Sequence, residues 1–130
     1  MREIKFRAIS ECRGEGWVYG DLRHYARNSH TEKWTIYDPA TGIETDIVED
    51  TIGQFTGMVD YVGSKVFEGD ILRLHIDGNE FVGSVEYNNY YGHFAFCQGS
   101  KKSTFAFIVP ANIEIIGNIH EHLELLEARH

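Results

Sequence analysis

Residues 70–87, DILRLHIDGNEFVGSVEY, contain the clearest structural signal in the chain. Apolar and polar residues alternate on both sides of the Asp77-Gly78-Asn79 segment, and a period of two is typical of a half-buried β-strand. Asp-Gly is a preferred sequence for tight hairpin turns, whose central residues need a positive φ. The stretch therefore predicts two antiparallel strands, residues 70–76 and 80–87, joined by a tight turn.

Further β-rich segments follow this hairpin at residues 90–97, 105–109 and 113–119. The polar segment QGSKK, residues 98–102, predicts a loop between the first two. Five short strands with tight connections have to hide their edges, and a small antiparallel barrel does so by curling one sheet upon itself. We therefore predict an SH3-like barrel over residues 67–120 and a short C-terminal helix or tail over residues 121–130.

The residues before the hairpin also show β patterning. Alternation predicts strands near residues 4–8, 17–22 and 33–37, whereas RNSHTE, residues 27–32, has no apolar residue and predicts an exposed loop. These segments form an N-terminal β subdomain, residues 1–66, within one domain that spans residues 1–130. The predicted fold class is mainly β with little helix.

Two glycine-containing stretches, TIGQFTGM at 51–58 and FEGDIL at 67–72, raise the question of a phosphate-binding loop. A P-loop needs Lys followed by Ser or Thr after its last glycine, but Gly57 is followed by Met-Val-Asp-Tyr. Gly69 precedes a predicted strand, and Asp70 is a residue type that hydrogen-bonds the backbone of a turn. Backbone geometry therefore explains both stretches without a bound phosphate.

Gly53 and Gly57 predict a bulge or bend that points Phe55 into the core. Gln54 and Thr56 then face outward. Gln54 is a candidate contact to a partner, and simple exposure to solvent is the alternative.

The charge balance limits the classes of partner. The 12 Lys and Arg residues against 20 Asp and Glu residues give a formal net charge of −8, which repels a nucleic-acid backbone on average. The basic residues nevertheless concentrate in the N-terminal third, so a local basic face and ordinary solvent-facing strand positions both remain open. These residues are Arg2, Lys5, Arg7, Arg13, Arg23, Arg27 and Lys33.

The composition, with 42% hydrophobic and 25% charged residues in 130, is typical of one soluble globular domain. The N-terminus lacks the apolar region of a signal peptide, and nowhere do 18 uncharged apolar residues run together, so we expect neither export nor membrane insertion. Cys12 and Cys97 lie far apart without a CxxC motif, which predicts buried thiols in a reducing, cytoplasmic compartment.

No catalytic motif is present. His120 and His122 would share one face of a strand, but a zinc site needs a third ligand such as His75, His93 or Glu124, and the chain has no HExxH or CxxC element. The serines include no GxSxG elbow, and the acidic residues are those that turns favour. We therefore predict no enzymatic activity, no metal and no cofactor.

Binding is the better supported class of function. Alternation over residues 90–97 places Tyr90, Phe94 and Phe96 on one face of a strand and Tyr91 on the other, so some aromatic side chains are exposed. Tyr87, Tyr90, Tyr91 and Phe94 are candidate partner-binding residues. A homo-oligomer contact or an unidentified protein partner is predicted, and single-stranded nucleic acid bound by these aromatics and the N-terminal basic residues is the alternative.

Four segments resemble the YopX family of phage and prophage proteins. They are MREIKFRA at 1–8, GWVYGDL at 16–22, TIGQFTGMVDYVGSKVFEGDIL at 51–72 and IIGNIHEHLELL at 115–126, in the family's order and across essentially the whole chain. The resemblance implies a mainly β, SH3-like fold and a phage-derived accessory protein in the cytoplasm of a bacterial host. It implies no established activity and no catalytic residues.

The chain departs from the family pattern at two places. DYVG at 60–63 stands where a more polar turn is usual, which predicts that Tyr61 and Val62 form an apolar tip at the surface. Tyr61 therefore joins the candidate partner-binding residues. His122 and Leu123 stand where an Asn-Pro pair is common, which leaves the start of the C-terminal helix undefined.

Overall fold

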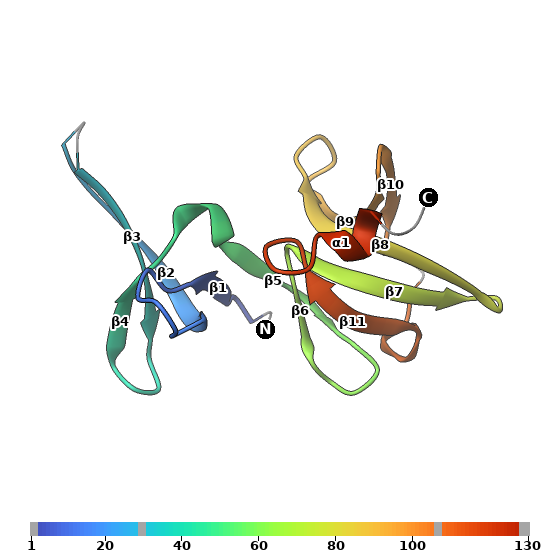
Figure 1. Ribbon diagram of the computed structural model, residues 1–130, viewed down its shortest axis with the longest axis horizontal. Coiled ribbons are helices and arrows are strands. Elements are labelled where there is room, and N and C mark those ends of the chain that lie inside the picture. Colours follow the sequence, from blue (N-terminus) through green and yellow to red (C-terminus); the bar gives the residue numbers. More distant parts are fainter. Residues whose placement is uncertain (1–2, 29–30, 106–107, 128–130) are drawn as a thin grey trace. The chain divides into compact units, whose positions relative to one another are not determined.

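The computed structural model describes residues 3–28, 31–105 and 108–127, and it shows a mainly β chain with two antiparallel sheets (Figure 1). By its internal contacts the chain divides into two compact units, the first ending at Phe55 and the second beginning at Thr56. We call them the N-terminal unit and the C-terminal unit. The mainly β fold class predicted from the sequence is confirmed.

The N-terminal unit is built from a meander of antiparallel strands. The bounds are β1 Phe6–Ile9, β2 Trp17–Asn28, β3 Thr31–Asp38, β4 Ile43–Asp46, the short 3-10 helix η1 Glu49–Thr51 and β5 Gly53–Val59. The order in this sheet is β4-β3-β2-β1-β5-β6, where β6 is Lys65–Phe67, and the boundary between the two units falls within β5.

One face of the N-terminal sheet carries its apolar core. Cross-strand register places Ala8 opposite Val18 and Leu22 opposite Ile36, so these side chains share a face. Ile47, just after β4, packs against the same cluster. The partly buried side chains around them complete the core, and they are Phe6, Trp34 and Ile52.

The loop predicted over residues 27–32 is wrong in part. β2 continues to Asn28 and β3 begins at Thr31, with Ala26 opposite Glu32 in the register. Backbone hydrogen bonds between two strands do not require apolar side chains, so a polar segment can extend a ribbon of two strands. Composition alone could not show this. Residues 29 and 30 lie outside the described residues.

The C-terminal unit contains the remaining elements and the second sheet. The bounds are β6 Lys65–Phe67, β7 Asp70–Ile76, β8 Asn79–Asn88, β9 His93–Gln98, β10 Lys101–Thr104, the 3-10 helix η2 Pro110–Asn112, β11 Ile113–Asn118 and the short helix α1 Glu124–Glu127. The order in this sheet is β10-β9-β8-β7-β11. β7 is therefore paired on both sides.

The hairpin of β7 and β8 has the predicted turn. Asp77 has φ 51° and Gly78 has φ 80°, as a two-residue turn with positive φ at both positions requires. The resulting register places Leu72 opposite Gly83 and Leu74 opposite Phe81. Leu72 and Leu74 are buried in the core of this unit, where they join Val66, Val85, Phe96 and Ile113.

Two strand predictions beyond this hairpin need correction. The strand predicted at residues 90–97 begins only at His93, so Tyr90 and Tyr91 lie in the turn before it. The loop predicted at residues 98–102 is shorter in the structure, a turn between β9 and β10, because β9 ends at Gln98 and β10 begins at Lys101. Of the strand predicted at 105–109, residues 105, 108 and 109 are not in a strand, and residues 106 and 107 lie outside the described residues.

The predicted closed barrel is also not found. Among the described residues, β10 and β11 stand at the two ends of the sheet order and do not pair with each other, so the SH3-like detail is not confirmed. A short edge strand rich in lysine discourages pairing with other chains. β10 has only 4 residues and begins with two lysines, so this edge is protected without closure.

Gly57 and Gly69, which were considered for a phosphate-binding loop, have structural roles. Gly57 has φ 90°, and Phe55 before it is buried as predicted, while Gln54 and Thr56 are half-buried rather than fully outward. The Gly69 amide donates to the Val85 carbonyl at 2.8 Å, so it is not free for an anion.

Asp70 accepts a hydrogen bond from the Phe67 amide at 2.7 Å. This is the predicted contact of an Asx residue with the turn backbone.

Gly20 provides a test of the packing between β2 and β3. A Cβ atom at this position would lie 2.1 Å from the carbonyl oxygen of Tyr37, and φ is 154°. We expect Gly20→Ala to lower the free energy of unfolding by more than backbone strain alone would. The extra loss should be about 1–3 kcal/mol, because the backbone of β3 must shift to make room for the methyl group. Urea denaturation followed by tryptophan fluorescence reports this change, because both tryptophans lie in the N-terminal unit.

Gly14→Ala is the matched control. Gly14 also has a positive φ, 88°, but a Cβ atom there would meet nothing within 4 Å. Its substitution should therefore show the cost of strain alone, on the order of 1 kcal/mol. Equal losses for the two variants would contradict the steric argument.

Candidate functional site

Among the described aromatic residues, the two most exposed, Tyr90 and Tyr91, lie in the turn between β8 and β9. We define the aromatic tip as Tyr87, Tyr90, Tyr91, His93 and Phe94. The Asn88 side-chain oxygen accepts hydrogen bonds from the amides of Tyr90, at 3.0 Å, and Tyr91, at 3.3 Å. Asn88 therefore holds this turn in shape, as Asx residues commonly do.

The rings of the aromatic tip contact one another. Tyr90 is 87% exposed and Tyr91 70%, and their ring centroids lie 4.8 Å apart in an edge-to-face arrangement. Tyr91 also stacks on His93 at 5.8 Å, and Tyr87 meets Phe94 edge to face at 5.2 Å. Phe94 packs in turn against the core of the unit. The tip is thus anchored at its base and exposed at its end.

The structure does not bring all the predicted partner-binding residues together. Tyr61 lies in the turn between β5 and β6, and Figure 1 shows this turn and the β8–β9 turn at opposite ends of the C-terminal unit. The predicted apolar surface tip is present there, with Tyr61 60% and Val62 66% exposed. Gln54 is half-buried in the N-terminal unit.

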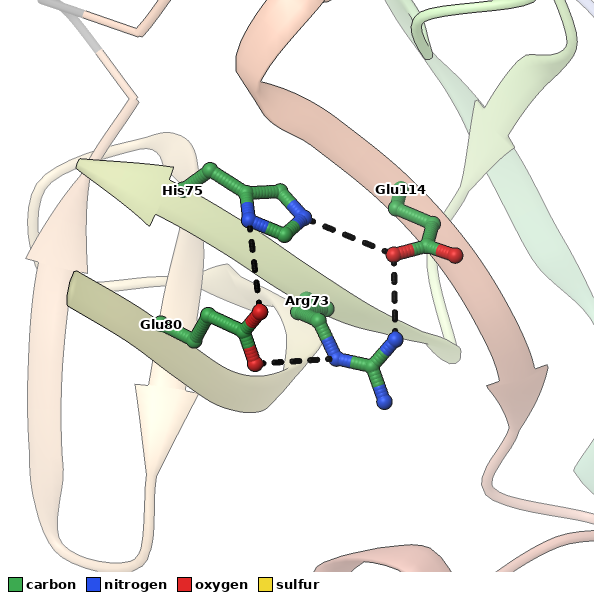
Figure 2. A network of polar contacts seen from close by, with 4 residues as sticks. All are labelled: Arg73, His75, Glu80 and Glu114. Atoms are coloured by element: carbon green, nitrogen blue, oxygen red, sulfur yellow. Dashed lines mark hydrogen bonds and ion pairs between the residues drawn. The ribbon is translucent and has the colours of Figure 1, made fainter. Parts of the chain in front are cut away.

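The outer face of the C-terminal sheet carries a charged network that sequence reasoning missed. Figure 2 shows Arg73 and His75 from β7 between Glu80 from β8 and Glu114 from β11. Arg73 Nη1 lies 3.1 Å from the Glu114 carboxylate, and Arg73 Nε lies 3.6 Å from the Glu80 carboxylate. His75 lies 3.4 Å from Glu114 and 3.7 Å from Glu80.

The alternation in β7 contained the signal for this network. Leu72 and Leu74 point to the core, so Arg73 and His75 share the opposite face. Their cross-strand neighbours include Glu114 of β11, opposite Arg73, and Glu80 of β8, opposite His75. Each carboxylate lies near both Arg73 and His75, so the Arg73 guanidinium group lies between two negative charges. Among residues 3–28, 31–105 and 108–127, no three His, Cys, Asp or Glu side chains are arranged to hold a metal ion.

This network should contribute little to stability. The side chains of Arg73 and Glu114 are 34% and 31% exposed, so solvent screens their attraction. We expect a double-mutant cycle with Arg73→Gln and Glu114→Gln to give a coupling of roughly 0.5–1 kcal/mol that decreases at high salt. Urea denaturation followed by far-UV circular dichroism measures it.

The ion pair of Lys33 and Asp46 is the control for this cycle, because its side chains are 58% and 52% exposed. Its coupling should be smaller. A larger coupling at this control pair would contradict the dependence on exposure.

The family model for the YopX protein matches residues 5–127 of the chain. The chain belongs to the YopX family. The resemblance predicted from the four sequence segments is confirmed, and it extends over both units.

A solved structure shows the same fold in another protein. It is described as the crystal structure of protein EF1440 from Enterococcus faecalis, and it is similar with a TM-score of 0.60 and 22% sequence identity. The alignment covers 97% of this YopX-family chain and 99% of the other chain. At this identity the likeness concerns the fold alone. No curated protein matches the chain.

The histidine pair of this YopX-family chain is not placed as predicted. β11 ends at Asn118, so His120 lies in the turn that follows and His122 just after this turn, and the two do not share a strand face. The His122 ring nitrogen Nδ1 accepts a hydrogen bond from the backbone N–H of Asn118 at 3.2 Å. The ring also sits above Gly117, where a Cβ atom would lie 2.9 Å from it. His122 therefore has a structural role.

The two cysteines differ in environment. Cys97 is buried as predicted, but Cys12 is exposed, which corrects the prediction of two buried thiols. Burial raises the pKa of the Cys97 thiol to about 12, with a smaller contribution from nearby Glu86. Because this pKa lies far above neutral pH, Cys97 stays protonated and weakly nucleophilic.

This difference is measurable with a thiol reagent. At about pH 8 we expect the native protein to react rapidly at Cys12 and to react at Cys97 only after unfolding. Ellman's reagent should release one rapid equivalent from the wild type and from Cys97→Ser. Rapid reaction of native Cys12→Ser would contradict both the burial and the raised pKa.

None of the helices in the described part of the chain is both long and apolar enough to cross a membrane.

Proposed function

We propose that this YopX-family chain is a non-enzymatic binding module that associates with a second copy of itself through the aromatic tip. The observation that carries the proposal is the exposure of Tyr90 and Tyr91 on a turn whose base is fixed by core packing of Phe94. Tyrosine presents a large, rigid surface with a polar end, which makes it frequent in protein contacts.

The charge distribution favours a second copy as the occupant. The chain has a formal net charge of −8, so two copies repel each other over most of their surfaces. Residues 87–94, YNNYYGHF, contain no Asp, Glu, Lys or Arg. The aromatic tip is therefore a surface on which two acidic molecules can meet with little repulsion.

The contact should be weak because the aromatic tip is small. A stable interface buries about 800 Å² per partner, which is more than a tip of five residues offers, so we expect a dissociation constant on the order of 10⁻⁵ to 10⁻³ M. Higher salt should strengthen the association slightly, since it screens the repulsion between the acidic copies.

Sedimentation velocity over about 10 μM to about 1 mM protein tests the proposal. We expect the wild type to shift toward a dimer with concentration, and the double variant Tyr90→Ser, Tyr91→Ser to weaken the association at least about tenfold. Tyr61→Ser is the matched control, because Tyr61 is also exposed but lies in the other turn. A wild type that stays monomeric throughout would overturn self-association.

Single-stranded nucleic acid remains the second candidate because of three cation–aromatic pairs in the N-terminal unit. Lys5 lies over Tyr19 at 5.9 Å, Arg7 over Trp17 at 4.3 Å and Arg23 over Tyr37 at 4.1 Å. Such pairs can stack on bases and neutralise phosphates.

The surroundings of these pairs count against that candidate. Arg23 also bonds Glu44 at 3.2 Å, and Arg7 is only 7% exposed. Fluorescence anisotropy with a labelled oligonucleotide at low and moderate salt separates the candidates: binding that collapses as salt rises would favour nucleic acid over self-association.

A further inference from the structure

A cavity of about 310 Å³ lies at one end of the C-terminal sheet, where β7 and β8 meet the β9–β10 turn. Its apolar wall comes from the core side of the sheet, and its rim is polar. The apolar lining residues are Leu74, Ile76, Phe81, Phe96 and Ile108, and the polar ones are Gln98, Lys101, Ser103, Thr104 and Asn112.

The charge at the rim of the cavity is positive. Among the described residues of the lining, Lys101 is the charged one and none carries a carboxylate. Lys101 makes no ion pair with any described residue, although the chain contains 20 acidic residues. An apolar cavity with a single unpaired cation at its rim is complementary to an apolar molecule with one negative charge.

We propose that this cavity binds a compact apolar molecule that carries one carboxylate. Its apolar body lies against Ile76, Phe81 and Ile108, and its carboxylate pairs with the Lys101 ammonium group at the rim. At roughly 30 Å³ for each water-sized group, the cavity holds about ten non-hydrogen atoms. A fatty acid of medium length has this size and this chemistry.

The site is distinct from the aromatic tip. Cross-strand register places Gly83 and Ser84 of β8 near the end of β9 where Gln98 lies, whereas the aromatic tip is at the opposite end of the same hairpin. The result of the ligand test is therefore independent of whether the chain self-associates.

The strand geometry supplies a matched control for the lysine. Successive residues of a strand point to opposite faces, so Lys101 and Lys102 are directed to different sides of β10. Lys101 lines the cavity, and Lys102 does not. Removing either charge changes the net charge equally, but only Lys101→Met removes it from the cavity.

The test uses octanoate, octanamide and octylamine, which have nearly the same size and carry a negative, neutral and positive head. Titration of the full chain with each, followed by ¹H–¹⁵N and methyl NMR, gives the three affinities. We expect octanoate to bind about three- to tenfold more tightly than octanamide, octylamine to bind most weakly, and the octanoate preference to decrease with salt. The shifted methyl groups should include those of Ile76 and Ile108.

Lys101→Met should remove the preference for octanoate over octanamide, and Lys102→Met should retain it. Lys101→Arg should restore the preference. Short peptides ending in leucine, as the free acid and as the amide, distinguish a chain terminus from a free acid as the source of the carboxylate: tighter binding of the peptide acid than of octanoate assigns the chain terminus.

Equal affinities of the wild type for octanoate and octanamide, or shifts that avoid Ile76 and Ile108, would overturn the proposal. Both readouts come from the wild type, so they hold even where a variant fails to fold. Retention of the preference in Lys101→Met would also reject the assigned role of this lysine.

Discussion

The register between β7 and β8 is the constraint on which the C-terminal unit depends. The positive φ angles at Asp77 and Gly78 close the turn, and the two strands then have a fixed alignment. A slip by one residue would exchange the two faces of a strand. Leu72 and Leu74 would leave the core, and the Arg73 and His75 side chains would enter it without their carboxylate partners. Burial of unpaired charge makes such a slip strongly unfavourable.

Much of the fold could be predicted because short-range chemistry determines it. Asp-Gly identifies the hairpin turn, alternation identifies β1, β7 and β11, and Asp70 forms the backbone contact expected of its residue type. The predictions fail where the hydrogen-bonding partner of a segment decides whether that segment forms a strand. Lys101 and Lys102 form a strand because β9 offers them hydrogen-bonding partners, and no feature of their own sequence shows this.

The candidate site was predictable in its residue types but not in its geometry. Aromatic density around residues 87–94 indicated exposed rings, because one strand cannot bury them all. The position of Tyr90 and Tyr91 in a turn depends on the Asn88 side chain, which bonds both amides. Tyr61 could not be placed, since its distance from the aromatic tip depends on how the strands of the C-terminal unit pair. The cavity beside Lys101 was not foreseen for the same reason: its lining comes from several strands and η2.

The two lysines of β10 have a consequence for assembly. A sheet that ends in a short, cationic strand resists the backbone pairing between molecules that leads to fibrils. Like charges on two copies of this edge would meet directly if the strands aligned. Backbone pairing between copies through this edge is therefore disfavoured, and a symmetric side-chain contact that uses the same patch on both molecules ends with the pair. In the self-association proposed above, Tyr90 and Tyr91 would join two copies, and the β10 edge would not extend the pair into a longer sheet.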